Sequence, residues 1–220
     1  MNKILISPSI LSGDFVNMQK SVESIEEWGG DLVHCDVMDG VYVPNITFGM
    51  PMIAAIKKIT KLPLDVHLMI TKPENYVDAF IDSGADYLTF HPDASKSIDK
   101  AQEALIKIRA KGKKAGIVFN PNIPFAPYSE LVFHCDILLI MSVYAGYGGQ
   151  KFIPESIARI TEVKEFMELN SIDIPIEIDG GITAENAKAV IDAGVTILVA
   201  GSAIYKSNDP KKTIEKMRVV

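Results

Sequence analysis

Cysteine is scarce in this sequence. Cys35 and Cys135 are the only two among 220 residues, and they form no C-x-x-C pair. This excludes a disulfide framework and indicates two free thiols in a reducing compartment. Long apolar runs are also absent, since none approaches the roughly 18 residues that a membrane-spanning helix requires. The N-terminal apolar stretch is interrupted by Pro8 and ended by Asp14, so no signal peptide is expected. We therefore expect a cytoplasmic protein that does not associate with membranes.

Positive charge is in deficit as well. Lysine and arginine number 22 against 28 acidic residues, for a net charge of −6 at pH 7. This balance argues against nucleic acid as a partner. An anionic substrate would have to be held by local hydrogen-bond donors, because the overall field repels it. With 48% hydrophobic and 23% charged residues, the composition is otherwise that of an ordinary globular protein.

Short β-rich runs alternate regularly with amphipathic stretches of helical length. The eight runs are 4–11, 32–37, 62–70, 87–91, 115–120, 137–143, 174–179 and 196–201. Strict alternation of eight strands with eight helices implies a parallel sheet. A count of eight without a linker favours a closed (β/α)₈ TIM barrel as one α/β domain over residues 1–220, rather than an open doubly wound sheet. The stretch 121–133, with three prolines, is the weakest of the expected helices.

The segment "HCDVMDG" (34–40) places ionisable groups inside a strand. Alternate residues of a barrel strand face the axis, so His34, Asp36 and Met38 share the inward face. The third strand repeats this pattern with Asp65, His67 and Met69, and the seventh ends at Asp179. Catalytic groups of such barrels lie at the C-terminal ends of strands. The sequence therefore predicts that His34, Asp36, His67 and Asp179 line a site at one end of the barrel.

A single inward histidine is usually a hydrogen-bonded core residue, which is the expectation for His91 and His134. Two imidazoles and two carboxylates are different, because without a cation they would leave like charges facing each other in a poorly solvated cavity. The set His34, Asp36, His67 and Asp179 therefore predicts one divalent metal ion, and it suits Zn²⁺, Fe²⁺, Mn²⁺ or Co²⁺ without discriminating among them. Three methionines recur near the same rim, where they either fill the core or cover an electron-rich intermediate. These are Met38, Met69 and Met141.

Glycines cluster after the last three strands, in "GYGGQ" (146–150), "DGG" (179–181) and "GS" (201–202). Loops in this part of a barrel bind phosphate through backbone N–H groups and helix N-termini. This predicts a phosphorylated small molecule as the substrate.

Over nearly its whole length the chain resembles the ribulose-phosphate 3-epimerase family. The matching motifs, in order, are "SPSILSGDF", "HCDVMDGVYVPNITFG", "LPLDVHLMI", "GGQKFIP", "EIDGGI" and "VAGSAIY". The resemblance implies a metal-dependent enzyme that interconverts D-ribulose 5-phosphate and D-xylulose 5-phosphate. It implies that the four residues named above bind the metal and that Asp36 and Asp179 transfer the proton. We also expect a homo-oligomer.

The resemblance further implies a set of substrate-binding residues. These are Ser9, His67, Met38, Met69, Met141, Gly146, Tyr147, Gly148, Gly149, Gly180, Gly181, Gly201 and Ser202. Two stretches depart from the family pattern. Tyr144-Ala145-Gly146-Tyr147 stands where Asn-Pro-Gly-Phe or Asp-Pro-Gly-Phe is usual, and Pro92-Asp93 follows His91. Both bear on substrate size and loop rigidity more than on reaction type.

Proton transfer fits the predicted arrangement. Inverting a carbon next to a carbonyl requires one group to remove a proton and another to return one from the opposite face. Strands two and seven lie about 135° apart around a ring of eight, so their aspartates can flank a substrate. Three alternatives stay open at this point: a ketohexose-6-phosphate 3-epimerase acting on D-allulose 6-phosphate, a metal-free isomerase or decarboxylase, and a barrel that binds a sugar phosphate without turnover.

Overall fold

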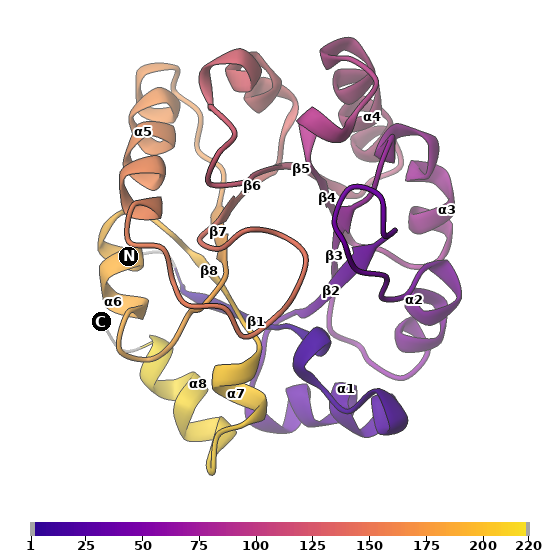
Figure 1. Ribbon diagram of the computed structural model, residues 1–220, viewed down its shortest axis with the longest axis vertical. Coiled ribbons are helices and arrows are strands. Elements are labelled where there is room, and N and C mark those ends of the chain that lie inside the picture. Colours follow the sequence, from indigo (N-terminus) through magenta and orange to yellow (C-terminus); the bar gives the residue numbers. More distant parts are fainter. Residues whose placement is uncertain (1–2, 219–220) are drawn as a thin grey trace.

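The computed structural model describes residues 3–218, whose eight parallel strands are surrounded by helices (Figure 1). The strands are β1 (Leu5–Pro8), β2 (Val33–Met38), β3 (Leu64–Met69), β4 (Tyr87–Phe90), β5 (Lys114–Phe119), β6 (Ile137–Met141), β7 (Ile176–Asp179) and β8 (Ile197–Ala200). Their order in the sheet is β1-β8-β7-β6-β5-β4-β3-β2. One isolated parallel bridge, between Ser9 and His34, links the two ends of this order. The predicted TIM barrel is confirmed as a nearly closed barrel.

Helices follow every strand except β5. They are α1 (Met18–Trp28), α2 (Met50–Lys57), α3 (Val77–Asp82), α4 (Ile98–Ala110), α5 (Ser156–Leu169), α6 (Ala187–Asp192), α7 (Ser202–Tyr205) and α8 (Pro210–Arg218). After β5 the chain forms a 3₁₀ helix, Ala126–His134, instead of the expected α-helix. Of the three prolines in 121–133, Pro121 and Pro124 precede this helix and Pro127 lies in its first turn, so they explain why the helix begins late but not why it is 3₁₀. Shorter 3₁₀ turns occupy Ile10–Ser12, Phe15–Asn17, Pro73–Asn75 and Pro92–Ala94.

The sequence pattern of β2 explains which face each of its side chains takes. Val33, Cys35 and Val37 pack in the main hydrophobic cluster between the strands and the surrounding helices. The alternate residues His34 and Asp36 are also buried, but they face the barrel axis. Because the side-chain period of a strand is two, apolar packing on one face places the ionisable groups on the other.

Two local features stabilise the connections. Gly29 caps the C-terminus of helix α1 with a left-handed φ of 84°, and its N–H bonds back to the last turn. Asp86, just before β4, pairs with Lys57 and Lys113 and accepts the N–H of Leu64. Partial burial opposes ionisation of Asp86, but the two ammonium groups outweigh it and lower its pKa below the usual value.

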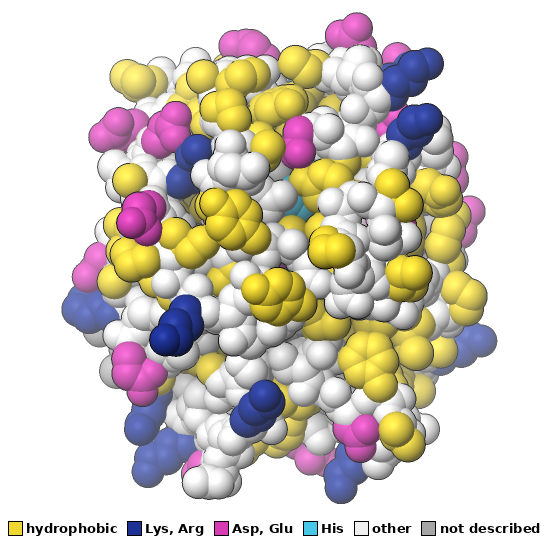
Figure 2. All heavy atoms as spheres, in the orientation of Figure 1, with side chains coloured by type: hydrophobic (Ala, Val, Ile, Leu, Met, Phe, Trp, Pro, Cys, Tyr) yellow, Lys and Arg dark blue, Asp and Glu magenta, His cyan; other side chains and the backbone are white. Residues whose placement is uncertain are grey.

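The site described below opens on one end of the barrel. In Figure 1 the segments that follow β2 and β6 lie in front of the ring of strands. Figure 2 shows the same face, with histidine atoms visible near its centre and hydrophobic side chains around them. Within residues 3–218, no helix combines the length and apolar character needed to cross a bilayer.

Candidate active site

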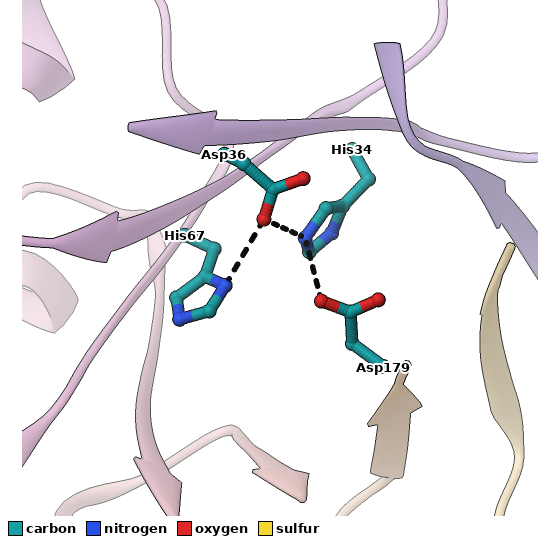
Figure 3. A group of neighbouring side chains, drawn as sticks. All are labelled: His34, Asp36, His67 and Asp179. Atoms are coloured by element: carbon teal, nitrogen blue, oxygen red, sulfur yellow. Dashed lines mark hydrogen bonds and ion pairs between the residues drawn. The ribbon is translucent and has the colours of Figure 1, made fainter. Parts of the chain in front are cut away.

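Four ionisable side chains meet at one end of the barrel (Figure 3). His34 and Asp36 come from β2, His67 from β3, and Asp179 is the last residue of β7. Nε2 of His34 lies 3.3 Å from Oδ1 of Asp36 and 3.9 Å from Oδ2 of Asp179. Nδ1 of His67 lies 3.3 Å from the same Asp36 oxygen. The structure thus brings together all four predicted metal ligands, whose ligand atoms lie within 4.8 Å of one another.

His34 is oriented by a second carboxylate beneath the site. Its Nδ1 lies 2.6 Å from Oδ2 of Asp65, which also accepts a hydrogen bond of 2.9 Å from Ser7. Asp65 is fully buried. Burial and the Asp65 charge raise the pKa of the adjacent Glu177 well above its usual value, so Glu177 stays protonated and Asp65 carries the negative charge. Burial opposes protonation of His34, but the charges of Asp65 and Asp36 raise its pKa well above the usual value. In the metal-free protein both ring nitrogens therefore carry protons, and Nδ1 donates to Asp65. Release of the second proton, as metal binding would require, turns the lone pair of Nε2 toward Asp36 and Asp179.

His67 is supported by a further histidine, which sequence reasoning assigned to the core. Nε2 of His67 lies 2.9 Å from Nε2 of His91, the residue that follows β4. Burial lowers the pKa of His91 well below its usual value, so its ring is neutral and can accept a hydrogen bond. Nδ1 of His67 is buried and has no hydrogen-bond partner among residues 3–218. This unpartnered nitrogen faces the two aspartates.

The two aspartates differ in charge state. Burial opposes ionisation of Asp36, but the positive charge of His34, its contact with the carboxylate and the nearby His67 ring outweigh it and hold the pKa of Asp36 well below the usual value. Burial and the neighbouring Asp36 carboxylate raise the pKa of Asp179 to about 7. In the metal-free protein, Asp36 is therefore the carboxylate and Asp179 the acid that holds a proton near neutral pH. Titratable groups whose pKa values are driven apart are typical of acid–base pairs.

The donor set fits a divalent cation. Two imidazole nitrogens and two carboxylates surround one point. A positive ion there would contact the buried Nδ1 of His67, which makes no hydrogen bond, and would take the place of the proton on Asp179. The partners of His34 and His67 are the outer contacts that typically fix the tautomers of metal-binding histidines. Sequence reasoning identified neither Asp65 nor His91 as part of this arrangement. The sequence did indicate a place for Asp65, because it shares the inward face of β3 with His67.

A pocket lies directly above these groups, and most of the predicted substrate residues line it. The predicted residues in its lining are Ser9, Met38, Met69, Met141, Gly146, Tyr147, Gly148, Gly149, Gly180, Gly181, Gly201 and Ser202, together with Asp36 and Asp179. Of the predicted substrate residues, His67 alone is not in this lining, and its ring is fully buried. The glycine after Gly180 shows why small residues are needed here. A Cβ on Gly181 would lie 2.4 Å from the backbone N of Phe152, and its φ is 62°.

The three methionines and Ser9 have defined positions. Met38 and Met69 are neighbours across β2 and β3, while Met141 packs in a separate cluster inside the barrel. All three are buried and all line the pocket, so they fill the core and cover the site at once. Oγ of Ser9 donates a 2.6 Å hydrogen bond to Oδ2 of Asp36. Ser9 therefore orients one of the two aspartates as well as facing the pocket.

Loop 6, defined as residues 144–150, contains the Tyr-Ala-Gly-Tyr departure. One side-chain amide inside the loop and one outside it donate hydrogen bonds to its backbone carbonyls. Gln150 donates hydrogen bonds to the carbonyls of Tyr144 and Tyr147, and Asn45 donates to the carbonyl of Gly146. The two tyrosines themselves are exposed, at 53% and 63%. Loop 6 therefore lacks proline but is held by hydrogen bonds from side-chain amides.

Comparison with known proteins identifies close relatives of the chain. The family model described as "Ribulose-phosphate 3 epimerase family" matches residues 5–205. The ribulose-phosphate 3-epimerase of Bacillus subtilis (strain 168) is 43% identical over 216 residues, covering 98% of both chains. That of Synechocystis sp. is 41% identical over 215 residues, covering 98% of this chain and 93% of the relative. The Escherichia coli (strain K12) enzyme is 39% identical over 219 residues, covering 99% and 96%.

More distant solved structures share the architecture. A 3-hexulose-6-phosphate synthase superposes with a TM-score of 0.67 at 18% identity, covering 99% of this chain and 98% of the other. The tryptophan synthase α-subunit of Pyrococcus furiosus gives 0.70 at 14% identity, covering 98% and 97%. At these identities the likeness supports the barrel fold alone.

Proposed function

The chain belongs to the ribulose-phosphate 3-epimerase family and interconverts D-ribulose 5-phosphate and D-xylulose 5-phosphate, and we propose that Asp36 and Asp179 move the proton in this reaction. The observation that supports these roles is their placement. The two carboxyl groups come from β2 and β7, lie 3.3 Å and 3.9 Å from Nε2 of His34, and line the same pocket. The relatives do not favour the hexulose, metal-free or non-catalytic alternatives.

The reaction needs two proton transfers at C3. In one direction the Asp36 carboxylate removes the C3 proton, the C–H electrons form the C2–C3 double bond, and the carbonyl electrons move to the C2 oxygen as an enediolate. Protonated Asp179 then returns a proton to the opposite face of C3, and the carbonyl re-forms. The roles exchange in the reverse direction. In the metal-free protein the pKa of Asp36 is lowered and that of Asp179 is raised, the order that this direction of the reaction requires.

His34, Asp36, His67 and Asp179 would hold one divalent metal ion, either Zn²⁺, Fe²⁺, Mn²⁺ or Co²⁺. When bound, such an ion supplies positive charge that stabilises the developing negative charge on the substrate oxygens. Metal analysis of protein purified without chelator, followed by activity after reloading with each ion, identifies the metal. His67→Ala is expected to lose most of the bound metal and most of the activity, with the barrel still folded by circular dichroism. Full activity in a metal-free preparation would contradict the assignment.

We also propose that loop 6 and the segments after β7 and β8 bind the sugar phosphate. Their backbones line the pocket, and Gly146, Gly149, Gly180 and Gly181 all have positive φ values that leave N–H groups free of side-chain bulk. Ser9 and the three methionines cover the other side. The expected homo-oligomer and cytoplasmic location stay predictions, testable by sedimentation and by cell fractionation.

The roles of the two aspartates are tested by exchange in deuterated water. Asp179→Asn is expected to exchange the C3 proton of one epimer with solvent without completing inversion, and Asp36→Asn should exchange only the other epimer. Each variant must be loaded with metal and its metal content measured, because both residues are also proposed ligands. Asp192→Asn, which alters an exposed carboxylate at the end of α6, is the matched control. Normal turnover by either metal-replete site variant would disprove the assigned roles.

A further inference from the structure

Asn120, the residue after β5, joins three segments around the pocket without lining it. Its Oδ1 accepts a 3.2 Å hydrogen bond from the backbone N–H of Ala145 in loop 6. Its Nδ2 donates a 3.0 Å hydrogen bond to the hydroxyl of Tyr42, in the segment after β2. The same Nδ2 lies 3.5 Å from Nδ1 of His91. One amide therefore contacts loop 6, the β2 segment and the histidine that supports His67.

The orientation of this amide follows from its partners. A backbone N–H can only donate, so the oxygen of Asn120 must face Ala145 and its nitrogen must face Tyr42. The Tyr42 hydroxyl in turn donates to Oδ2 of Asp93 at 3.1 Å. The Tyr42 ring packs against His91, with ring centroids 4.8 Å apart. Asn120 is thus fixed at both ends, which lets it act as a rigid anchor.

Loop 6 needs such an anchor. Gln150 joins the loop to itself, but that bond does not fix the position of the loop relative to the barrel. Two side-chain hydrogen bonds do so, one from Asn45 to the Gly146 carbonyl and one between Asn120 and Ala145. The second exists only because residue 145 is not proline, since proline has no N–H. The alanine at position 145 therefore makes this contact possible.

We propose that Asn120 is a positioning residue that holds loop 6 over the pocket through the Ala145 N–H. The inference deepens the proposed function, because loop 6 is the segment proposed to bind the sugar phosphate. Asn120 touches neither the pocket nor the four ligands, so its contribution is to substrate binding through the position of the loop and not to proton transfer. KM is therefore expected to change more than kcat.

Hydrogen exchange tests the anchor without any substrate. In Asn120→Leu, which has similar volume and no polar atom, amide exchange in a peptide spanning 143–150 is expected to rise about threefold or more. Exchange in peptides from the other strands and helices should stay as in the wild type. The matched control is Asn122→Leu, two residues along the same segment, because Asn122 is exposed and makes no side-chain hydrogen bond with residues 3–218. Unchanged exchange in loop 6 would overturn the proposal.

Kinetics test whether the bond to Ala145 is the reason. Asn120→Leu is expected to raise the KM for D-ribulose 5-phosphate about three- to tenfold, the size of one neutral hydrogen bond, with kcat changed less than about twofold. In an Ala145→Pro background, where no such bond can form, adding Asn120→Leu should leave KM unchanged within about twofold. An equal rise in both backgrounds would show that Asn120 acts by another route and would refute the proposal.

Failure of the Asn120 proposal can be told apart from failure of the proposed function. Loss of wild-type turnover, or full activity of His67→Ala, would disprove the assigned reaction or its metal while leaving the exchange result intact. Conversely, a normal KM and normal loop exchange in Asn120→Leu would refute only the anchor. If Asn120→Leu fails to fold, the hydrogen exchange of loop 6 residues 146–150 in Ala145→Pro decides, because the same bond is removed from the other side. Unchanged exchange there would also refute the anchor.

Discussion

Replacing Asp65 with asparagine is expected to weaken metal binding by about 10- to 100-fold, although Asp65 is not one of the four proposed ligands. The carboxylate is fully buried, lies 2.6 Å from Nδ1 of His34, and holds the negative charge of the group beneath the site. It determines which nitrogen of His34 keeps its proton when the ring becomes neutral, as metal binding requires. The substitution keeps the volume of the side chain and removes only its charge and one acceptor.

Both orientations of the new amide are unfavourable. If its oxygen faces His34, a charge-assisted hydrogen bond becomes a neutral one of roughly half the strength, and the imidazole becomes a weaker ligand. If its nitrogen faces His34, the ring must carry its proton on Nε2, the atom that points at Asp36 and Asp179. A protonated Nε2 cannot bind a metal. The expected loss corresponds to about 1.4–2.7 kcal/mol of binding free energy.

The assay is a titration of chelator-stripped protein with Co²⁺, followed by visible absorbance in competition with a chelating dye. Asp86→Asn is the control, because it removes a paired carboxylate that is only partly buried and makes no contact with His34. Circular dichroism and thermal unfolding of both variants separate a local effect from loss of the fold. A Kd for Asp65→Asn within twofold of the wild type, with the fold intact, would refute the reasoning.

Three further predictions concern backbone fit and charge. Gly181→Ala is expected to lower kcat/KM about 100-fold, because the new Cβ would lie 2.4 Å from the backbone N of Phe152 and would displace the pocket wall by about 1 Å. Gly49→Ala is the kinetic control, because a Cβ there would have no atom within 4 Å. Ser171→Gly should raise the free energy of unfolding by up to about 1 kcal/mol in urea denaturation, because Ser171 has a φ of 55° after α5, and a loss of stability would contradict this. Asp86→Asn should lose about 1–2 kcal/mol of unfolding free energy at pH 7. The pKa of Asp86 is lowered in the folded state, so the stability that it contributes is present above about pH 4 and is lost as the pH falls through its folded-state pKa. A difference in unfolding free energy between wild type and Asp86→Asn that persists at pH 2 would contradict the assignment.

Much of the site was predictable from local pattern. The alternation in "HCDVMDG" determined that His34 and Asp36 share the face opposite Cys35, because a strand has a fixed period of two. The repeat in β3 placed His67 at the same height, and the parallel register sets Asp36 beside it. The three prolines after β5 identified the weakest helix in the chain, which the structure replaces with a 3₁₀ helix. These inferences needed only the covalent geometry of the chain.

Other features depend on contacts between segments far apart in the sequence. The meeting of His91 with His67, and of Asn120 with Ala145, joins residues on different strands and loops. Neither follows from any periodicity, because closure of the barrel sets the distances between strands.

The tertiary structure also decided the charge states. Asp36 and Asp179 have the same side chain and similar positions at the ends of strands, yet their pKa values move in opposite directions. Two imidazoles surround Asp36, whereas Asp179 faces the Asp36 carboxylate. The sequence by itself thus determined which residues reach the site, since strand period and register act locally. The structure alone decided what each residue does there, because proton affinity depends on the charges and burial that folding brings around it.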